Sequence, residues 1–340
     1  MKKYSRILVA LLIFCMSVTG FVSCGKHKEA EEEPIDVITD PGINVTEVKI
    51  AIQPSAAFIP LYVAKNAGWI EEALAPYGVT VKWNTFSAGP PMNDSLAMGE
   101  SDFGVIGDVP TVSGVFNTGK TEVIAIAAQA ARSYAMLVAP DSDVTEPSQL
   151  VGATVATVVG STSHNMVDKY MRSGGFTIDD VQLVSITTGD AADMLRKGEV
   201  KAVSIWEPNV TRLSAGGVAK ILSEGPDVGL AGTNAIVANK EFVNNNPTIT
   251  KIILEQYKRG AEALPTLSDE EWGDVGSDLS VTTSQIKEIV KKFDYTIVIS
   301  EKDMDDLNDT IDFLVRIGNL PEDFDIRDYT DRSFADEVMK

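Results

Sequence analysis

The segment from Trp83 to Pro110, WNTFSAGPPMNDSLAMGESDFGVIGDVP, constrains the fold more than any other part of the chain. It predicts a strand, a loop, a helix that opens with proline after Gly89, and a second short strand over residues 102–106. The turn that follows predicts another helix, with Asp108 as its N-cap. We therefore expect two helix N-termini on neighbouring parallel strands at one sheet edge. Free N–H groups and the helix dipole make such an edge suitable for binding an anion.

Composition and charge narrow the class of protein. The 340 residues are 44% hydrophobic and 23% charged, which is typical of a globular chain long enough for two domains. The formal net charge of -20 argues against nucleic acid as a partner, because phosphate binding requires clustered Lys and Arg. It also argues against electrostatic docking on anionic lipid. The ordinary consequence of such acidity is solubility.

Residues 1–23 have the pattern of a lipoprotein signal peptide. A positive n-region precedes an apolar stretch over residues 7–16, which is too short for an ordinary spanning helix. The sequence FVSCG at residues 21–25 resembles a bacterial lipobox, which implies lipid attachment to Cys24 and cleavage before it. Two or more acyl chains would anchor the protein stably. An ordinary secretory signal is the alternative, and residues 24–46 are predicted to form a polar tether.

The chain lacks the sequence motifs of several enzyme classes. It has two cysteines, and Cys15 lies in the segment that would be removed, so the mature domain has no pair to oxidise. There is no Walker A pattern for ATP, no Cys/His cluster for zinc and no Gly-x-Ser-x-Gly elbow. We therefore predict a protein that is not an enzyme and that has no cofactor and no metal site.

Strands and helices alternate from Val48 to residue 238, which predicts an α/β architecture with parallel sheets. The stretches 96–103 and 195–202 are similar, because in each a helix ends at glycine shortly before a strand. This repetition predicts two similar α/β lobes. The C-terminal third is expected to be mainly helical, over residues 247–264, 284–292 and 301–317.

Eight short segments together resemble the type II periplasmic binding proteins of ABC importers, in the nitrate, sulfonate and taurine branch. They are IQ at 52–53 with FIPL at 58–61, FSAGP at 86–90, GESDFG at 99–104, GDVP at 107–110, LVG at 150–152, GSTS at 160–163, GEVKA at 198–202 and WEP at 206–208. The resemblance implies a two-lobed fold with two hinge strands, near residues 133–135 and 233–235. Lobe one would comprise residues 46–136 plus 235–340, and lobe two residues 137–234.

The resemblance also implies a function. The chain would be an extracytoplasmic solute-binding lipoprotein, anchored by lipid to the bacterial cell membrane in the periplasm or on the outer face. As a monomer it would bind a sulfonate, taurine or nitrate-like anion between its lobes. The permease and ATPase of the importer would be its partners, and closure around the ligand would be the signal that the permease senses.

Three alternatives remain open from the sequence. The same fold binds pyrimidine precursors of thiamine or riboflavin-type precursors in related proteins, although the cysteine-rich motif of the pyrimidine binders is absent here. Lyases of the menaquinone pathway resemble these receptors and offer an enzymatic alternative. A sensory module that presents a bound solute to another partner is the third.

Four candidate ligand contacts come from the ends of the first two predicted strands. Gln53 and Ser55 follow the first strand, at the edge where ligands of open α/β sheets bind. Ser87 offers a hydroxyl and Gly89 permits close approach of the backbone, both just before a helix. A polar loop and ordinary turn chemistry are the respective alternatives.

The second lobe contributes five further candidates. Ser161, Thr162 and Ser163 open a helix, where hydroxyls and free N–H groups suit a sulfonate, because its oxygens only accept hydrogen bonds. Trp206 could cover an apolar part of the ligand, or it could be a core aromatic. Glu207 could bind a ligand amine or brace the hinge.

Five other residues have structural explanations at least as strong as a functional one. Gly107 could admit a ligand to the backbone, and Asp108 either caps a helix or meets a ligand ammonium group. Arg132 could pair with an anion or form a hinge salt bridge. His164 is expected to be a packing or surface residue, and Asp190 to be a helix cap.

Overall fold

The computed structural model describes residues 37–340. The predicted signal peptide, the lipid attachment at Cys24 and most of the tether lie outside the described residues. Within residues 37–340, no helix combines the length and the apolar character needed to span a membrane.

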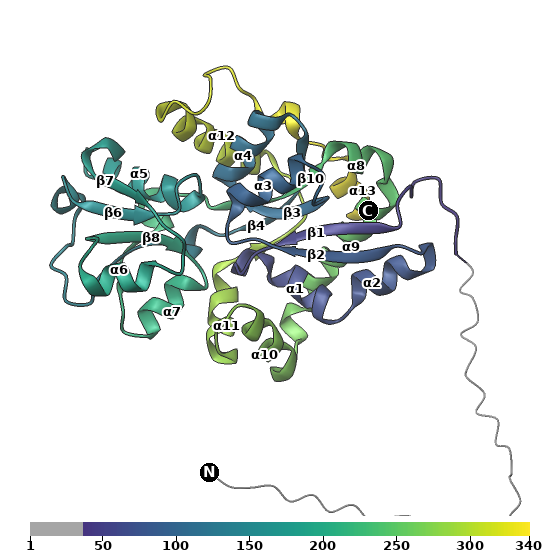
Figure 1. The fold of residues 1–340 in the computed structure, drawn as a ribbon, viewed down its shortest axis with the longest axis horizontal. Helices are drawn as coiled ribbons and strands as arrows, with labels where there is room; N and C mark the ends of the chain where they lie inside the picture. The colour runs from purple at the N-terminus through teal and green to yellow at the C-terminus, as the bar shows by residue number, and fades with distance from the viewer. Residues whose placement is uncertain (1–36) are drawn as a thin grey trace, which may run out of the picture. The chain divides into compact units, whose positions relative to one another are not determined.

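The first of two sheets has six strands in the order β11-β4-β10-β3-β1-β2 (Figure 1). Strand β1 pairs in parallel with both β2 and β3, whereas β10 is antiparallel to β3 and β4. β1 therefore separates the two strands of the segment 83–110, and the expectation that they are neighbours is wrong, because the chain adds β3 on the other side of β1. The strands are β1 (Glu47–Ile52), β2 (Thr80–Thr85), β3 (Phe103–Gly107), β4 (Thr121–Gln129), β10 (Thr233–Asn239) and β11 (Asp294–Tyr295).

The second sheet has five strands in the order β7-β6-β8-β5-β9. Strand β6 pairs in parallel with β7 and β8, and β5 is antiparallel to β8 and β9. The pattern of a parallel core with antiparallel additions is thus the same as in the first sheet. The strands are β5 (Tyr134–Val138), β6 (Thr154–Thr157), β7 (Gln182–Ser185), β8 (Ala202–Trp206) and β9 (Lys220–Glu224).

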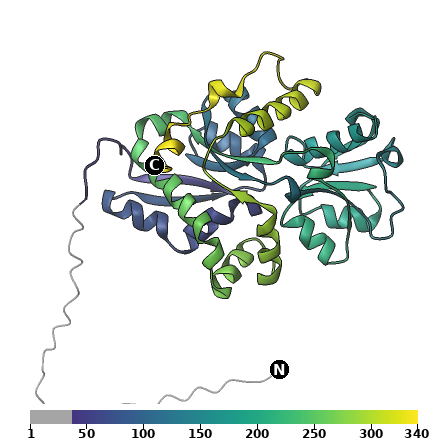
Figure 2. The same ribbon diagram turned by 180° about the vertical axis from the view of Figure 1, so that it is seen from behind.

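Helices cover both sheets (Figure 2). The second sheet carries α5 (Thr162–Ser173), α6 (Ala191–Lys197) and α7 (Asn209–Ala215). The other helices are α1 (Ile59–Asn66), α2 (Trp69–Leu74), α3 (Gly89–Ala97), α4 (Asp108–Thr118), α8 (Lys240–Asn245), α9 (Pro247–Ala263), α10 (Asp269–Asp278), α11 (Thr283–Ile289), α12 (Glu301–Arg316) and α13 (Ser333–Val338). The predicted helical C-terminal region is confirmed, except for β11, a strand of two residues that was not predicted.

The chain passes twice between the sheets. After β4 it runs through a short 3-10 helix, η3 (Ala131–Ser133), into β5. After β9 it runs through η6 (Gly225–Val228) back to β10 in the first sheet. The lobe boundaries predicted after residues 136 and 234 lie within β5 and β10 respectively.

Two apolar clusters form the core of the described residues. The larger one joins the first sheet and its helices to the α5 face of the second sheet, and includes Ile50, Phe103 and Met166. The smaller one lies between the other face of the second sheet and the helices α6 and α7, around Val203 and Ile205. Alternate residues of β8 thus face different clusters, as expected for a strand that is covered on both sides.

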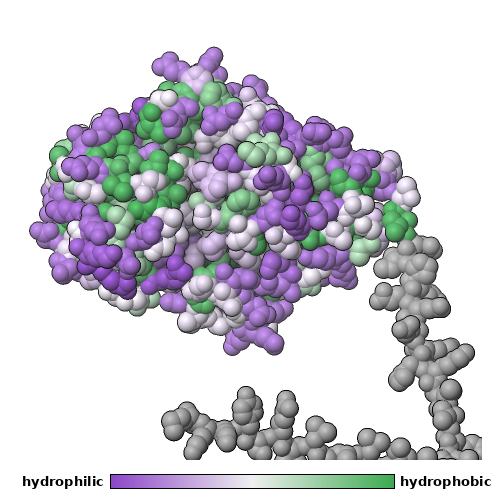
Figure 3. All heavy atoms as spheres, viewed as in Figure 1, coloured by the Kyte–Doolittle hydropathy of each residue, from purple (hydrophilic) through white to green (hydrophobic). Residues whose placement is uncertain are grey.

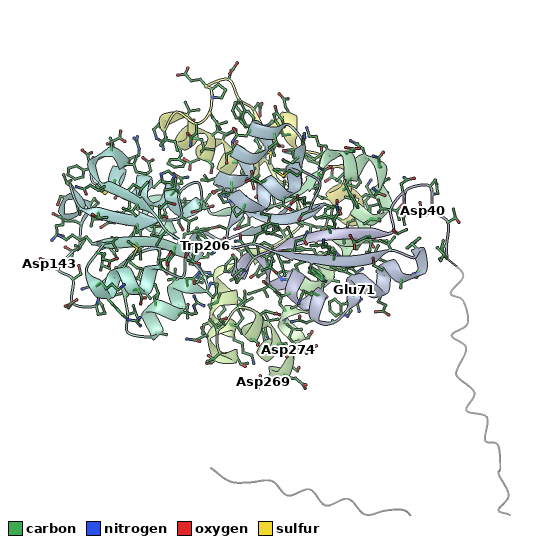
Figure 4. The ribbon with its side chains drawn as sticks, viewed as in Figure 1. Asp40, Glu71, Asp143, Trp206, Asp269 and Asp274 are labelled. Atoms are coloured by element: carbon green, nitrogen blue, oxygen red, sulfur yellow. The ribbon has the colours of Figure 1, made fainter. Side chains whose placement is uncertain are left out.

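Hydrophilic residues dominate the face shown in Figure 3, and hydrophobic residues gather on it mainly over the second sheet. Acidic side chains project from the parts of the chain around both sheets, and exposed examples are Asp143, Asp269 and Asp274 (Figure 4). Acidic residues are densest in residues 301–340, which hold 13 Asp and Glu against five Lys and Arg.

Candidate ligand-binding site

The predicted site residues lie at the carboxyl ends of the strands or just beyond them. Gln53 follows β1, and Gly107 is the last residue of β3. In the second sheet, Ser161 follows β6 after a short loop, and Trp206 ends β8. Trp206 lies at the junction between the two sheets (Figure 4). Ligands of open α/β sheets bind at such carboxyl edges.

The first turns of three helices meet at this edge. A Cβ atom on Gly89, the first residue of α3, would lie 2.7 Å from Cγ of Pro110 in α4. A Cβ atom on Gly160, just before α5, would lie 3.6 Å from Cγ of Pro90 in α3. Gly89 is therefore required for close helix packing, which explains the glycine without a ligand. The meeting of α3, α4 and α5 brings their partial positive charges together.

Asp108 links α4 to α5 at the point where the first turns of α3, α4 and α5 meet. Its side chain is buried, and Oδ1 accepts hydrogen bonds from the Thr162 hydroxyl and the Val109 N–H, each at 2.6 Å. The prediction that Asp108 is the N-cap is wrong: Gly107 is the N-cap, and Asp108 is the first residue of α4. Its carboxyl group therefore bonds an N–H group in the first turn of α4 and also reaches the Thr162 hydroxyl of α5.

The environment of Asp108 disfavours the ionised form of its carboxyl group. Burial raises the pKa of its carboxyl to about 6, although hydrogen bonds from Thr162, Val109 and Thr310 lower it in part. Burial likewise raises the pKa of Asp102, the residue just before β3, to about 6. In the unfolded chain both pKa values would be about 3.9.

These two raised pKa values predict that the protein gains stability as the pH falls from 7 towards 4. Between about pH 6 and 4 the folded state binds more protons than the unfolded state, so the free energy of unfolding rises as the pH decreases. Replacement Asp108→Asn should remove part of this gain and leave the part due to Asp102. Urea midpoints of both proteins at pH 7.5 and 5 measure the difference. An equal pH response of the two proteins would contradict a raised pKa at Asp108.

The first turn of α5 contains buried polar groups that have no partner. The Ser161 hydroxyl donates to the carbonyl of Val158 at 2.6 Å, and the Thr162 hydroxyl is bonded to Asp108. In contrast, the Ser163 hydroxyl and both polar atoms of the Asn165 amide are buried and lack a hydrogen-bond partner among the described residues. As the first helical residues, Thr162 and Ser163 also have N–H groups without an acceptor in a preceding turn.

Several unpaired buried polar atoms lie near the carboxyl ends of strands or in the first turn of α5. Nine such side-chain atoms occur in residues 37–340, and five of them belong to Gln53, Ser163, Asn165 and Ser204. Each buried polar group without a partner costs roughly 1–3 kcal/mol, so a cluster of them calls for a ligand or bound water. The donors and acceptors of this cluster are uncharged.

Glu207 forms a brace between the parts of the chain that carry the two sheets. Its fully buried carboxylate accepts hydrogen bonds from the N–H and hydroxyl of Thr211 and pairs with Lys292 Nζ at 2.8 Å. Lys292, in the 3-10 helix η8 (Val290–Lys292), also pairs with Glu224 of β9 at 3.3 Å. Burial by itself lowers the pKa of Lys292, but the charges and hydrogen bonds of both glutamates together raise it. The pair with Lys292 is in agreement with the bracing role predicted for Glu207, and the role of binding a ligand amine stays a prediction.

Three other candidates differ in their surroundings. Ser55 is buried and accepts a hydrogen bond from the Ala57 N–H at 3.4 Å, as the N-cap of η1 (Ala56–Phe58). Ser87 is exposed, two residues before α3. Trp206 is 6% exposed and belongs to the larger apolar cluster, which fits the core alternative.

Three residues for which the sequence allowed either a functional or a structural role have structural roles. Arg132 donates to the backbone carbonyl of Lys291 at 2.6 Å, so the contact it makes is neither an anion contact nor a salt bridge. Asp190 stands at the N-cap position of α6, but its carboxylate accepts from the N–H and hydroxyl of Thr187 and not from the helix. His164 is buried and packs edge-on against Phe313, as expected for a packing residue.

Sequence reasoning missed Asn165, Ser204 and Lys292. Asn165 carries a local signal, because it lies in the first turn of a helix that was already predicted to bind an anion. Ser204 stands two residues before Trp206 in an apolar strand, where a lone polar residue is unusual. Lys292 gave no signal, because its partners Glu207 and Glu224 are distant in the sequence.

A cavity of about 1470 Å³ lies elsewhere, at the amino end of β1, and Glu47, Lys49, Asp102 and Lys240 contribute to its lining. This end of a parallel strand is opposite to the edge where α/β sheets bind ligands. Its volume therefore does not make it the stronger candidate. Among residues 37–340, no group of three or more His, Cys, Asp and Glu side chains is placed to hold a metal ion.

Comparison with known proteins gives consistent matches. The family pattern described as NMT1/THI5 like matches residues 55–266. A protein of Bacillus subtilis (strain 168) with the provisional name aliphatic sulfonates-binding protein is 25% identical over 342 residues, which cover 100% of this chain and 98% of that protein. The taurine-binding periplasmic protein of Escherichia coli (strain K12) is 26% identical over 212 residues, or 62% of each chain.

A solved structure shares the fold. The alkanesulfonate-binding protein SsuA from Xanthomonas axonopodis pv. citri bound to MOPS superimposes with a TM-score of 0.77, at 18% identity, over 86% of this chain and 100% of that chain. At this identity the likeness concerns the fold alone. Together with the two sheets and the helical C-terminal region, it confirms the predicted α/β fold class of a type II periplasmic binding protein.

Proposed function

This chain belongs to the NMT1/THI5-like family, and on that basis we propose that it is the extracytoplasmic solute-binding component of an ABC importer. Its ligand is a small organic anion of the sulfonate class, with taurine and nitrate as related candidates. The relatives named for sulfonates and taurine support this proposal. The ligand would be delivered to a permease that is driven by a separate ATPase.

One observation carries the choice of site: uncharged, unpaired buried polar groups lie where the first turns of α3, α4 and α5 meet. The hydroxyl of Ser163, the Asn165 amide and the first N–H groups of α5 would donate to the ligand. The neighbouring residues Gln53, Ser87 and Gly107 would complete the contact surface.

The chemistry of these donors suits a sulfonate. A sulfonate is ionised at neutral pH, and its three oxygens accept hydrogen bonds but do not donate. Helix N-termini bind such groups through N–H donors and the dipole, without a full positive charge. The net charge of -20 adds no long-range attraction for an anion, so the binding energy must come from these local donors.

Asp108 would then restrict which sulfonates bind. It lies against Thr162 in the first turn of α5, and an ionised carboxylate there repels a plain anion. A ligand that also carries an ammonium group, such as taurine, would offset this repulsion. We therefore propose that zwitterionic aminosulfonates bind more tightly than plain alkanesulfonates of equal length.

Thermal unfolding with a panel of ligands tests the proposed function. The panel comprises ethanesulfonate, taurine, nitrate, a pyrimidine precursor of thiamine and riboflavin. A ligand at 100 times its Kd stabilises the folded state by about 2.7 kcal/mol, which raises the melting temperature clearly. A shift with sulfonates is expected. A shift with only the pyrimidine or riboflavin would show that the ligand belongs to that class and not to the sulfonates. Turnover of a substrate by the purified protein would indicate a lyase.

The two-lobe organisation is part of the proposal. We assign one lobe to the first sheet and its helices, within residues 46–136 plus 235–340, and the other to the second sheet, within residues 137–234. The hinges would be the crossings near residues 133–135 and 233–235. The protein would act as a monomer that closes around its ligand and thereby presents a recognisable surface to the permease.

The lipid anchor can be tested separately. We expect that Cys24→Ser prevents incorporation of labelled fatty acid and releases the protein from the membrane fraction, because two or more acyl chains account for stable anchoring. Fatty-acid labelling followed by membrane fractionation measures both effects, and Cys15→Ser is the matched control. Undiminished labelling of the Cys24→Ser protein would exclude lipidation at this position.

A further inference from the structure

Two charged pairs connect α5, which packs on the second sheet, with α12 near the C-terminus. Asp168 Oδ2 accepts from Arg316 at 2.8 Å, and Lys169 Nζ lies 2.7 Å from Asp309 Oδ2. Neither pair involves a residue of the candidate site. Asp168 and Lys169 lie further along α5, the helix whose first turn carries Ser163 and the other unpaired groups.

The pairs are arranged so that only one alignment of the helices satisfies both. On α5 an acid is followed directly by a base, whereas on α12 the acid Asp309 lies two turns before the base Arg316. A shift of one helix along the other would bring like charges together, which is unfavourable. Phe313, which lies between Asp309 and Arg316 on α12, packs edge-on against His164 of α5, with ring centroids 5.2 Å apart. The contact therefore combines charge complementarity with shape.

Water can reach the contact from one side. A cavity of about 670 Å³ is lined by Asp168, Arg172, Arg316 and Asn319, among other residues. Side-chain exposure is 36% for Arg316 and 46% for Asp309, whereas Asp168 and Lys169 are mostly buried. Because the charges lie beside solvent, they can be rehydrated when the helices separate. An ion pair of this kind is suited to a contact that forms and breaks.

We propose that α5 and α12 form a latch, in which the pairs Asp168–Arg316 and Lys169–Asp309 hold the two lobes together and set the fraction of closed molecules before a ligand arrives. The proposal rests on the two-lobed binding function. If only closed molecules bind tightly, the apparent Kd equals the intrinsic Kd divided by the closed fraction. These four side chains are then positioning residues that change affinity without touching the ligand.

The test measures, in the full chain, the distance between a dye placed after α5 and a dye placed after α12. Azidophenylalanine at the exposed positions Asp179 and Glu322 accepts a pair of fluorescent dyes, which avoids the native cysteines. We expect Lys169→Asp, which opposes Asp309, and Arg316→Gln each to increase the distance in the ligand-free protein. The double variant Lys169→Asp/Asp309→Lys should restore it. Lys251→Gln is the matched control, because its pair with Glu337 at 2.6 Å lies outside the latch.

Affinity provides the second readout. With taurine and ethanesulfonate as probes, Lys169→Asp and Arg316→Gln should raise the Kd at least about threefold, and the double variant should recover most of the loss. Unchanged dye distances in both single variants would overturn the latch, even if both probes bind as in the wild type. Increased distances in a protein that binds neither probe would support the latch and contradict the proposed ligand class.

Discussion

Replacement Gly107→Val should reduce affinity for the ligand about 100-fold or more, which corresponds to roughly 2.7 kcal/mol. A Cβ atom at this position would lie 2.5 Å from the Thr162 Oγ1 atom, closer than non-bonded atoms approach. Thr162 cannot easily move, because its side chain is β-branched and its hydroxyl is bonded to Asp108. The added side chain would keep the two helix N-termini apart and prevent closure.

The backbone does not account for this glycine. Gly107 has φ −65°, which any residue can adopt, so the substitution introduces a clash across the site and no backbone strain. Isothermal titration calorimetry with taurine measures the loss. The double variant Gly107→Ala/Thr162→Ala should bind better than Gly107→Ala alone, since the next atom of residue 162 is at 3.7 Å. Gly273→Ala on α10 is the control, because a Cβ atom there would make only an ordinary contact, 3.5 Å from Thr283 Oγ1.

Wild-type affinity in Gly107→Val would show that the helix N-termini need not meet for binding. A loss in Gly107→Val together with a loss in the control would instead point to general damage. Circular dichroism and urea unfolding of each variant separate these outcomes from a failure to fold.

Replacement Lys292→Met should destabilise the folded state by about 2–4 kcal/mol. The substitution removes the cation beside Glu207, whose side chain is 0% exposed, and leaves a buried negative charge that is held only by Thr211. Breaking a buried pair typically costs 3–5 kcal/mol, and the partial exposure of Lys292 reduces this value. The urea midpoint should fall accordingly.

Two comparisons make the result specific. Lys302→Met removes an exposed lysine paired with Asp306 at 2.5 Å and should change stability by no more than about 0.5 kcal/mol. The double variant Lys292→Met/Glu207→Gln should recover part of the loss, because the buried group is then neutral. Equal midpoints for Lys292→Met and Lys302→Met would contradict a bracing role for the buried pair.

The sequence predicts the fold class well, because periodicity and turn chemistry are local. The strand β3 and the proline-opened helix α3 follow directly from the residues at 89–107. The order of strands is less accessible, since nothing in the segment 83–110 indicates that β1 lies between β2 and β3. Strand order depends on long-range pairing, and the signal in a single sequence is local.

In the candidate site, too, local features are predictable from the sequence and long-range contacts are not. The residues that begin α5 are predictable, because a run of small hydroxyl residues after glycine is a common helix start. The contact of Asp108 with Thr162 and the pair of Glu207 with Lys292 are not, because each joins segments more than 50 residues apart. The local signal indicated an N-cap for Asp108, whereas Gly107 is the N-cap and tertiary packing brings the Asp108 carboxyl group into contact with a second helix as well.

The most direct test of the binding site is a crystal structure of the protein grown with taurine. We predict that the sulfonate oxygens lie within hydrogen-bonding distance of the Ser163 hydroxyl, the Asn165 amide or the first N–H groups of α5, with the ammonium group near Asp108. A taurine molecule bound in the cavity at the amino end of β1, beside Lys49 and Lys240, with the α5 N-terminus unoccupied, would contradict it.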